Sequence, residues 1–210
     1  MPTGSTSHPV IDRAEYRERQ ARVRALAAER GWPGVAVIGR GGGTYDRHGD
    51  LWYLTGHYQG YAYLHDRVPL WSGRSHAMLV LPVDGPSVLV CSAPEWEDSL
   101  PVDDIRSGDD FGALAREALQ AVKGGGLVGF DTAPASIADI LSDAKLAADD
   151  ELLEHLRRSK SPAEIAVIRD ACRIGSRAVD RFIAAAVPDA TEGDAVSAAL
   201  GEVLAKGAWP

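Results

Sequence analysis

The chain has 210 residues, 45% of them hydrophobic, and carries a formal charge of −8 at pH 7. This size and composition allow one well-buried core and exclude a chain that is unfolded throughout. The negative charge argues against nucleic acid and anionic membrane surfaces as partners, because both are bound through clustered Lys and Arg side chains.

Targeting signals and disulfides are not indicated either. Residues 1–9 lack the apolar core of a signal peptide, and no apolar run has the length of a membrane span, so we expect a soluble, cytoplasmic protein. The two cysteines, Cys91 and Cys172, are too few for a disulfide framework or a thiolate metal site. We expect both to be buried and reduced.

The beginning of the chain predicts a helix and then strands. We expect residues 1–11 to form a disordered tail, after which Asp12 can cap a helix that continues to Arg30. The apolar run at 35–38 lies between glycines, which is typical of a strand covered on both faces. A weaker strand signal follows at 51–54.

Residues 55–76 are the least regular segment. They hold aromatic residues, glycines, prolines and histidines without a clear period, so we expect an ordered loop. Six aromatic residues lie in or beside it: Trp52, Tyr53, Tyr58, Tyr61, Tyr63 and Trp71. Such side chains can line a pocket or an interface, and packing in the core is an equally good interpretation.

The next seventy residues predict a hairpin and then alternating helices and strands. Two apolar runs, 77–81 and 87–91, flank a turn sequence that contains Asp-Gly. Further along the chain we expect a helix, a strand and a helix at 111–122, 127–130 and 135–146. This order predicts an α/β domain over residues 12–146, in which a mixed sheet lies between flanking helices.

The pattern changes near residue 147. Residues 147–161 contain no confident strand, and we interpret them as a linker. The segment Ser161-Pro-Ala-Glu164 combines a capping serine, a proline at the first helical position and a glutamate, and Thr191-Glu-Gly-Asp194 offers a second capping box. Residues 162–210 therefore predict two packed helices. Two helices are too few for an independent domain, because each has an apolar face that one neighbour cannot cover.

The stretch from Leu156 to Ile174 resembles the junction of the creatinase/prolidase/aminopeptidase P family, where an Arg-x-x-Lys-Ser segment enters the first helix of the catalytic domain. Thr191-Glu192 and Ala205-Lys-Gly207 resemble the second helix of that domain, and Tyr53-Leu-Thr-Gly56 is similar to a segment of the family's amino-terminal domain. The resemblance implies a creatinase N-terminal-like α/β domain followed by an incomplete, all-helical start of a pita-bread domain.

The resemblance places the family's metal chemistry outside this chain. In the family, two metals are held by two Asp, one His and two Glu that follow the second helix, where this sequence ends. We therefore expect a chain truncated before the metal ligands, with no catalytic residue, no metal ligand and no cofactor of its own. A pair of Mn, Co or Zn ions and a peptide or small amide substrate are expected in a full-length parent.

The resemblance also implies roles for four residues. In the family the amino-terminal domain commonly builds a dimer interface and borders an active site. We therefore expect a homodimer, and we assign His57 and Tyr58 to a substrate entrance. Arg157 and Lys160 are expected to anchor the junction structurally through charge-assisted hydrogen bonds.

Other titratable residues indicate no active site by themselves. The pairs Asp103-Asp104, Asp109-Asp110 and Asp149-Asp150 lie in polar segments, where a solvated surface is the simplest interpretation. Four histidines fall in one region but match no short zinc motif, so we expect them on the surface or in loops: His48, His57, His65 and His76.

Two further motifs fail the test of context. The glycine run at 39–43 lacks the third glycine and the helix start of a dinucleotide-binding loop. Ser75 lies in a Gly-x-Ser-x-Ala sequence that a strand follows, whereas a nucleophile elbow requires a helix there. A nucleotide-using enzyme therefore has little support.

Two functional hypotheses remain. The first is the non-catalytic amino-terminal portion of a metal-dependent Xaa-Pro peptidase-like hydrolase, which serves in oligomerisation and borders the active site of the complete enzyme. The alternative is a stand-alone α/β binding or assembly module without enzymatic activity, which associates through its apolar helical faces. The mass of the protein in solution bears on both hypotheses.

Overall fold

The structure is a computed structural model that describes residues 10–41, 47–58, 73–93, 100–129 and 133–208. The chain divides into two compact units, of which one is Asp12–Arg158 and the other contains Ser159–Pro210. Most of the expected tail, residues 1–9, and the greater part of the expected loop, residues 59–72, lie outside the described residues.

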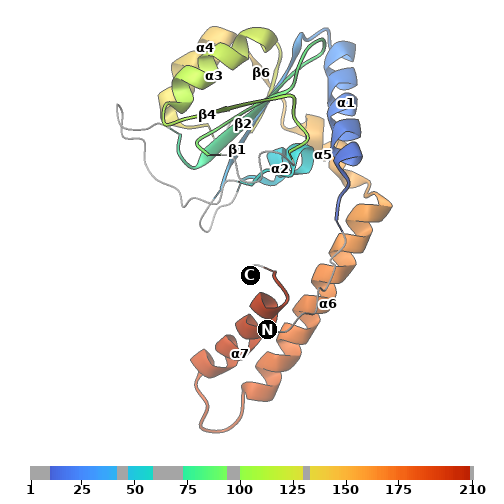
Figure 1. The fold of residues 1–210 in the computed structure, drawn as a ribbon, viewed down its shortest axis with the longest axis vertical. Coiled ribbons are helices and arrows are strands. Elements are labelled where there is room, and N and C mark those ends of the chain that lie inside the picture. Colours follow the sequence, from blue (N-terminus) through green and yellow to red (C-terminus); the bar gives the residue numbers. More distant parts are fainter. Residues whose placement is uncertain (1–9, 42–46, 59–72, 94–99, 130–132, 209–210) are drawn as a thin grey trace. The chain divides into compact units, whose positions relative to one another are not determined.

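A six-stranded sheet forms the centre of the first unit (Figure 1). Its order is β4-β3-β2-β1-β5-β6, and β2 runs antiparallel to both of its neighbours while the other pairs are parallel. The strands are β1 (Gly34–Arg40), β2 (His76–Pro82), β3 (Val88–Cys91), β4 (Asp104–Ser107), β5 (Gly126–Val128) and β6 (Ala147–Ala148). The predicted hairpin and mixed sheet are thus confirmed.

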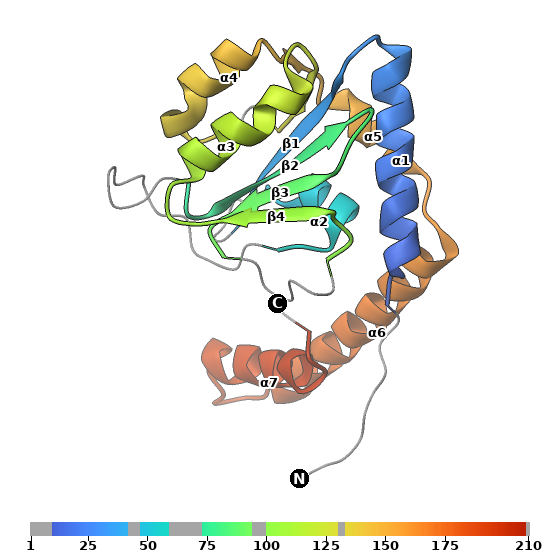
Figure 2. The same ribbon diagram turned by 45° about the horizontal axis from the view of Figure 1, so that its top comes forward.

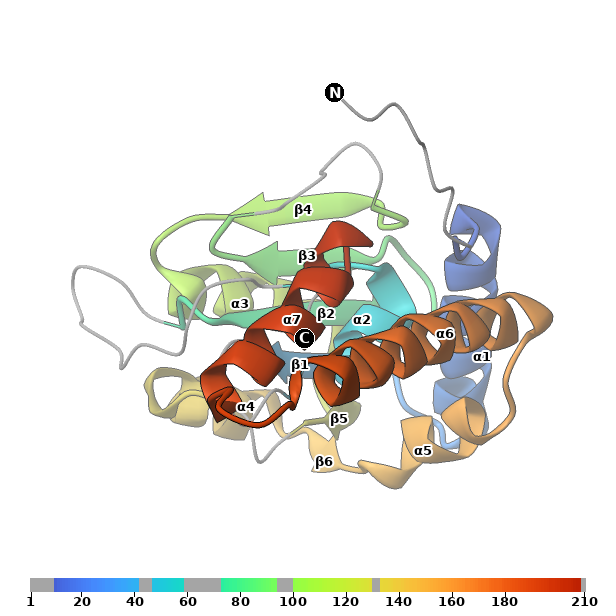
Figure 3. The same cartoon turned by 90° about the horizontal axis from the view of Figure 1, so that it is seen from below.

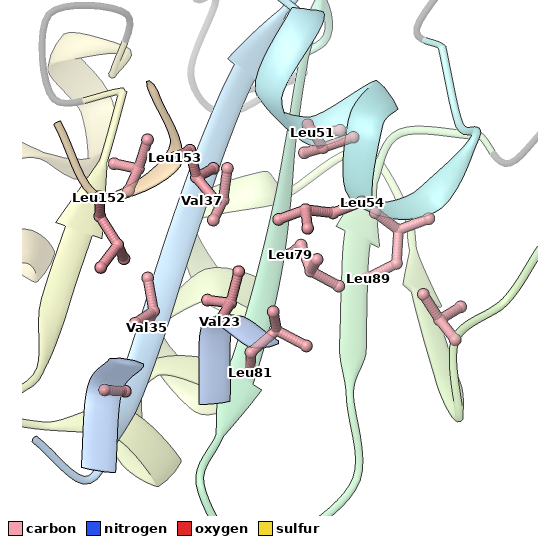
Figure 4. Packing of buried hydrophobic residues seen from close by; sticks show 14 of the residues in the cluster. Val23, Val35, Val37, Leu51, Leu54, Leu79, Leu81, Leu89, Leu152 and Leu153 are labelled. Atoms are coloured by element: carbon pink, nitrogen blue, oxygen red, sulfur yellow. The ribbon is translucent and has the colours of Figure 1, made fainter. Parts of the chain in front are cut away.

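Helices cover both faces of this sheet (Figures 1 and 2). One face carries three helices: α1 (Arg13–Glu29), α2 (Gly49–Thr55) and α5 (Glu151–Arg158). The other face carries two helices, each next to a short 3₁₀ helix: α3 (Phe111–Leu119) is followed by η2 (Gln120–Val122), and α4 (Ala138–Ala144) is preceded by η4 (Ala135–Ile137). Alternate residues of β1 enter the two cores, with Val35 and Val37 on one face and Ala36 and Ile38 on the other. The first of these cores is drawn in Figure 4.

Helix α1 begins where the sequence predicts it, because the Asp12 carboxylate accepts a hydrogen bond from the backbone N–H of Ala14 at 2.9 Å. Its buried face carries the polar residues Arg19 and Gln20 as well as Val23 and Ala27. The Gln20 amide donates to the carbonyl oxygens of Leu54 at 2.9 Å and Pro101 at 2.8 Å. These bonds satisfy a buried amide and join α1 to two distant segments of the chain.

The weak strand signal at 51–54 is wrong, because these residues belong to helix α2. Leu51 and Leu54, three positions apart, lie on one helical face and are fully buried against the sheet, whereas Trp52 is exposed. Gly56 ends the helix in the left-handed conformation, at φ 68°, and its N–H donates to the Trp52 carbonyl. An apolar run of four residues does not distinguish a strand from a helix, and the burial of both leucines against the sheet decides for the helix.

The acidic pair Asp103-Asp104 is not a simple solvated surface. Asp104 begins the edge strand β4, and the Asp103 carboxylate accepts hydrogen bonds from the Ser87 N–H at 2.8 Å and the Ser87 hydroxyl at 2.7 Å. Arg17 of α1 also donates to Asp103, at 2.8 Å. Asp103 therefore links the start of β3, the start of β4 and the first helix.

Residues 147–161, expected to be a linker, contain strand β6 and helix α5 instead. Leu152 and Leu153 of α5 are buried in the same core as α1, and Asp149 forms an ion pair with Arg30 at 3.3 Å. Asp150 accepts a hydrogen bond from the Gly129 N–H at 2.7 Å. The pair Asp149-Asp150 is thus structural, and burial of two leucines keeps α5 within the sheet unit.

The second unit is a hairpin of α6 (Pro162–Ala185) and α7 (Glu192–Ala205), which Figure 3 shows from below. Both predicted capping boxes are present: the Ser161 hydroxyl accepts from the Glu164 N–H at 3.0 Å, and that of Thr191 from the Asp194 N–H at 3.2 Å. The prediction for the cysteines is right for Cys91, which is buried, and wrong for Cys172, which is exposed on α6. Among the described residues no helix is long and apolar enough to cross a membrane.

The hydrogen bonds to Asp103 make a prediction about acid stability. Burial alone would raise the pKa of this carboxyl, but the hydrogen bonds from Ser87 and Arg17 outweigh it and hold the pKa below the ordinary value of 3.8. A depressed pKa in the folded state contributes stability above the ordinary pKa, and this contribution disappears as the pH falls through the folded pKa.

We therefore expect Asp103→Asn to lower the free energy of unfolding by about 1 kcal/mol near pH 6, a value reduced by the partial exposure of the side chain. The difference from the wild type should shrink below about pH 4. Urea denaturation at a series of pH values measures it, with the exposed Asp109→Asn as control. A difference that is constant from pH 7 to pH 3 would contradict this assignment.

Candidate functional site at one edge of the sheet

Three histidines and a tyrosine gather where β1 ends and β2 begins. His76 is the first residue of β2 and lies opposite Arg40, the last residue of β1. His48 and His57 flank helix α2 at its two ends, and Tyr58 follows. The carboxyl ends of the parallel strands share this edge, which is where ligands bind in open α/β sheets.

The two ends of α2 are fixed by backbone and hydroxyl hydrogen bonds. The Thr55 hydroxyl donates to the Leu51 carbonyl at 2.8 Å and accepts from the His57 N–H at 3.0 Å. The left-handed Gly56 lies between them, so the chain turns back toward the start of the helix. This turn brings His57 and Tyr58 next to His48, nine and ten positions earlier.

The rings of these residues are in contact. The His48 ring lies 5.8 Å from that of His57 in an edge-to-face arrangement and 5.2 Å from the Tyr58 ring, measured between centroids. Gly39 of β1 allows this approach, because a β-carbon at that position would lie 3.2 Å from Nδ1 of His48. The cluster therefore rests directly on the end of the central strand.

His76 occupies a second place at the same edge. Its ring lies 6.3 Å from that of Phe111, the first residue of α3, and its backbone N–H donates to the Gly73 carbonyl at 2.8 Å. Gly73 has φ 60°, and a β-carbon there would lie 2.7 Å from the Phe111 ring. A glycine is therefore required at this turn for two reasons.

The histidines were expected on the surface or in loops. His48 and His57 do lie outside helices and strands, whereas His76 belongs to β2, and none of the three is on the surface, since each is about 1% exposed. His65 lies outside the described residues. No spacing rule identified this burial, because the contacts join residues on either side of a helix and on two strands. Within the described part of the chain, no group of three or more His, Cys, Asp or Glu residues could hold a metal ion.

The two residues assigned to a substrate entrance are neighbours but differ in exposure. His57 is buried, whereas 40% of the Tyr58 side chain is exposed. Of the two, Tyr58 can meet a molecule that arrives from solution, and His57 can act by holding the turn that presents it. The arrangement therefore offers an aromatic contact surface with a phenolic hydroxyl.

Of the two residues assigned to the junction, Arg157 joins α5 to α2. Its guanidinium donates to the Asp50 carboxylate, and its Cζ lies 5.9 Å from the centroid of the Tyr53 ring. Tyr53 is also contacted by Arg19, a buried residue that sequence analysis did not single out. The Cζ atom of Arg19 lies 4.2 Å from the Tyr53 centroid, and its guanidinium donates to the Tyr53 carbonyl at 2.8 Å. Lys160 is exposed and lies in the other unit.

Comparisons with known proteins give matches in structure only: no protein-family model matches the chain, and no curated protein matches its sequence. A dipeptidase from Mycobacterium ulcerans is 22% identical, with a TM-score of 0.58 over 91% of this chain and 51% of its own. The prolidase from Pyrococcus horikoshii OT3 is 15% identical, with a TM-score of 0.66, and the match covers 90% of this chain and 49% of the prolidase. An Xaa-Pro dipeptidase from Bacillus anthracis is 15% identical, with a TM-score of 0.61, and the match covers 91% of this chain and 49% of the dipeptidase.

The chain thus spans about half the length of the solved structures that it resembles, while they match about nine-tenths of it. At identities this low, the structural similarity shows a common fold and nothing more. The predicted fold, a mixed α/β sheet flanked by helices and followed by further long helices, is confirmed.

Stability measurements can separate the roles of the two entrance residues. His57→Ala removes a buried ring and its contact with His48, so we expect the free energy of unfolding to fall by about 2 to 4 kcal/mol. Tyr58→Ala removes a half-exposed side chain and should cost about 1 kcal/mol or less. Urea denaturation of both variants measures the difference. Equal losses would mean that Tyr58 is as important to packing as His57.

Proposed function

We propose that this chain is the non-catalytic amino-terminal portion of a metal-dependent Xaa-Pro peptidase-like hydrolase, that it serves in oligomerisation and that it borders the active site of the complete enzyme. The observation that carries the proposal is the extent of the common fold, which includes about nine-tenths of this chain and about half of a prolidase and two dipeptidases. The segment from Leu156 to Ile174 supports the same kinship through its resemblance to the family's junction.

The metal pair of such an enzyme, Mn, Co or Zn, does not fit the described residues, which offer no group of three ligands. A two-metal hydrolase activates water between ions held by converging carboxylates and histidine. In the proposed arrangement these ligands belong to the remainder of the complete enzyme. No catalytic step is assigned to a residue of this chain.

Tyr58 is the residue proposed to border the substrate. Its exposed ring lies beside the buried His48 ring, and the turn through Gly56 and His57 fixes its position. An aromatic face of this kind suits a proline ring or another compact apolar group, and the hydroxyl can hydrogen-bond a peptide carbonyl. His57 contributes by packing and holds the turn.

The alternative, a stand-alone binding or assembly module, is favoured by one specific observation. Large apolar side chains of the helical hairpin are exposed, and they include Val179, Ile183 and Leu204. Exposed apolar clusters of this kind mark interaction surfaces. Such a module would associate through the hairpin and would have no hydrolase parent.

Metal titration and an activity assay test the non-catalytic part of the proposal. Calorimetric titration of the 210-residue chain with Mn²⁺, Co²⁺ or Zn²⁺ should show no tight, stoichiometric binding, and the chain with these ions should not hydrolyse an Xaa-Pro dipeptide. The physical reason is the lack of a converging ligand set among the described residues. Stoichiometric binding accompanied by turnover would refute the proposal.

The entrance role is tested in a longer protein that carries this chain and hydrolyses an Xaa-Pro peptide. Tyr58→Ala should raise KM about tenfold, through loss of one aromatic contact, and should leave the metal content unchanged. Trp52→Ala is a matched control, because Trp52 is exposed on α2 and lies outside the cluster. Unchanged kinetics for the Tyr58 variant would exclude the role.

A further inference from the structure

Helix α2, which presents Tyr58, is short and has a weak beginning. It has seven residues, Gly49 is the first of them, and among the described residues no side chain caps it at His48, whereas α1, α6 and α7 each begin with a capping side chain. A glycine in the first turn and the lack of a cap both favour fraying. Leu51 and Leu54 hold the middle of α2 against the sheet (Figure 4), so its first turn depends on contacts with other segments.

Arg157 of α5 supplies such contacts. Its guanidinium donates to the carboxylate of Asp50 in the first turn of α2, and a β-carbon at Gly49 would lie 3.2 Å from Nη2 of the same guanidinium. Its Cζ lies 5.9 Å from the centroid of the Tyr53 ring, which is within cation–π range. A partly exposed ion pair adds little to the free energy of unfolding. We therefore expect Arg157 to act mainly on the geometry of the first turn.

Helix α1 holds the other end of α2. A β-carbon at Gly56 would lie 3.2 Å from Cζ of Tyr16 in α1, so the turn that follows α2 rests on the Tyr16 ring. Arg19 of α1 contacts two tyrosines, with its Cζ 5.1 Å from the Tyr16 centroid and 4.2 Å from the Tyr53 centroid. The end of α2 is thus fixed by α1, and its beginning is fixed by α5.

The beginning of α2 also determines where the Tyr58 ring rests. His48 directly precedes the helix, and its ring centroid lies 5.2 Å from that of Tyr58. Backbone hydrogen bonds join Arg47 to Arg40 at the end of β1, from the Arg47 N–H at 2.9 Å and from the Arg40 N–H at 3.4 Å. His48 therefore lies between a residue that is tied to the sheet and a first turn that Arg157 braces. Fraying of that turn would move the His48 ring and remove the support of Tyr58.

We propose that Arg157 is a positioning residue for Tyr58. It holds the first turn of α2 through Asp50 and Gly49, this turn fixes the His48 ring, and the His48 ring supports that of Tyr58. The role differs from the anchoring of the junction that the sequence predicts for Arg157, because the contacts of its guanidinium lead to α2. The effect on the Tyr58 ring is independent of the proposed function, whereas any effect on substrate binding rests on it.

Nuclear Overhauser spectra of the 210-residue chain test the position of the ring. The wild type should give a cross-peak between ring protons of His48 and Tyr58, and Arg157→Leu should abolish it. Arg158→Leu is the matched control and should retain the cross-peak, because it removes the same side chain one position later, where the guanidinium pairs with Glu154 within α5.

A milder variant keeps the test decisive if Arg157→Leu impairs folding. Arg157→Lys keeps the charge beside Asp50, but a compact ammonium group cannot span Asp50, Gly49 and Tyr53 as the planar guanidinium does, so the cross-peak should weaken. Methyl resonances of Leu119 and Ile137, which lie in the core on the other face of the sheet, should be unchanged in each variant and show that the fold is retained.

A double-mutant cycle tests the consequence for substrate binding in a longer protein that carries this chain and hydrolyses an Xaa-Pro peptide. Arg157→Leu should raise KM about fivefold and change kcat by less than about twofold. The double variant with Tyr58→Ala should have the KM of Tyr58→Ala alone, because Arg157 acts through the tyrosine. Arg158→Leu should leave both constants unchanged.

Failure of this inference and failure of the proposed function give different results. A cross-peak that persists in folded Arg157→Leu, or that Arg158→Leu also abolishes, would overturn the positioning role and leave the proposed function in place. Additive effects of Arg157→Leu and Tyr58→Ala on KM would show that Arg157 does not act through Tyr58. If Tyr58→Ala leaves the kinetics unchanged, the entrance role fails, and the cross-peak still decides whether Arg157 positions the ring.

Discussion

The sheet unit depends on one constraint, which is that its central strands are apolar on both faces. Every residue of β1 except Arg40, and every residue of β2, is buried. Such strands are stable only when helices cover both sides, because either face exposed to water would forfeit the hydrophobic stabilisation that favours the fold. Two separate cores result, one under α1, α2 and α5 and the other under α3 and α4.

This constraint also determines where polar groups can lie. Gln20 and Arg19 of α1 face the sheet, and they are tolerated there because backbone carbonyls satisfy their donors. The three buried histidines occupy the edge where β1 ends and β2 begins. The cluster at the end of the central strand is therefore held in place by the core beside it.

The helical hairpin, unlike the sheet, leaves most of its apolar surface exposed. Its two helices bury only Ile174, Ala178 and Ala195 among the described residues, and most of its large apolar side chains are exposed. Each helix is begun by a capping box, and the buried side chains of Ile174, Ala178 and Ala195 pack the two helices together.

The sequence alone determined the elements whose signals are local. The caps at Asp12, Ser161 and Thr191, the strand at 35–38 and the hairpin at 77–91 required only neighbouring residues, and the resemblance around Leu156 led to the correct fold. Only the tertiary structure decided that residues 51–54 are helical, that Asp103 joins three segments, that α5 belongs to the sheet unit and that three histidines are buried. Each of these depends on contacts between residues that are distant in the chain, and a local pattern carries no record of the partner that buries or binds a side chain.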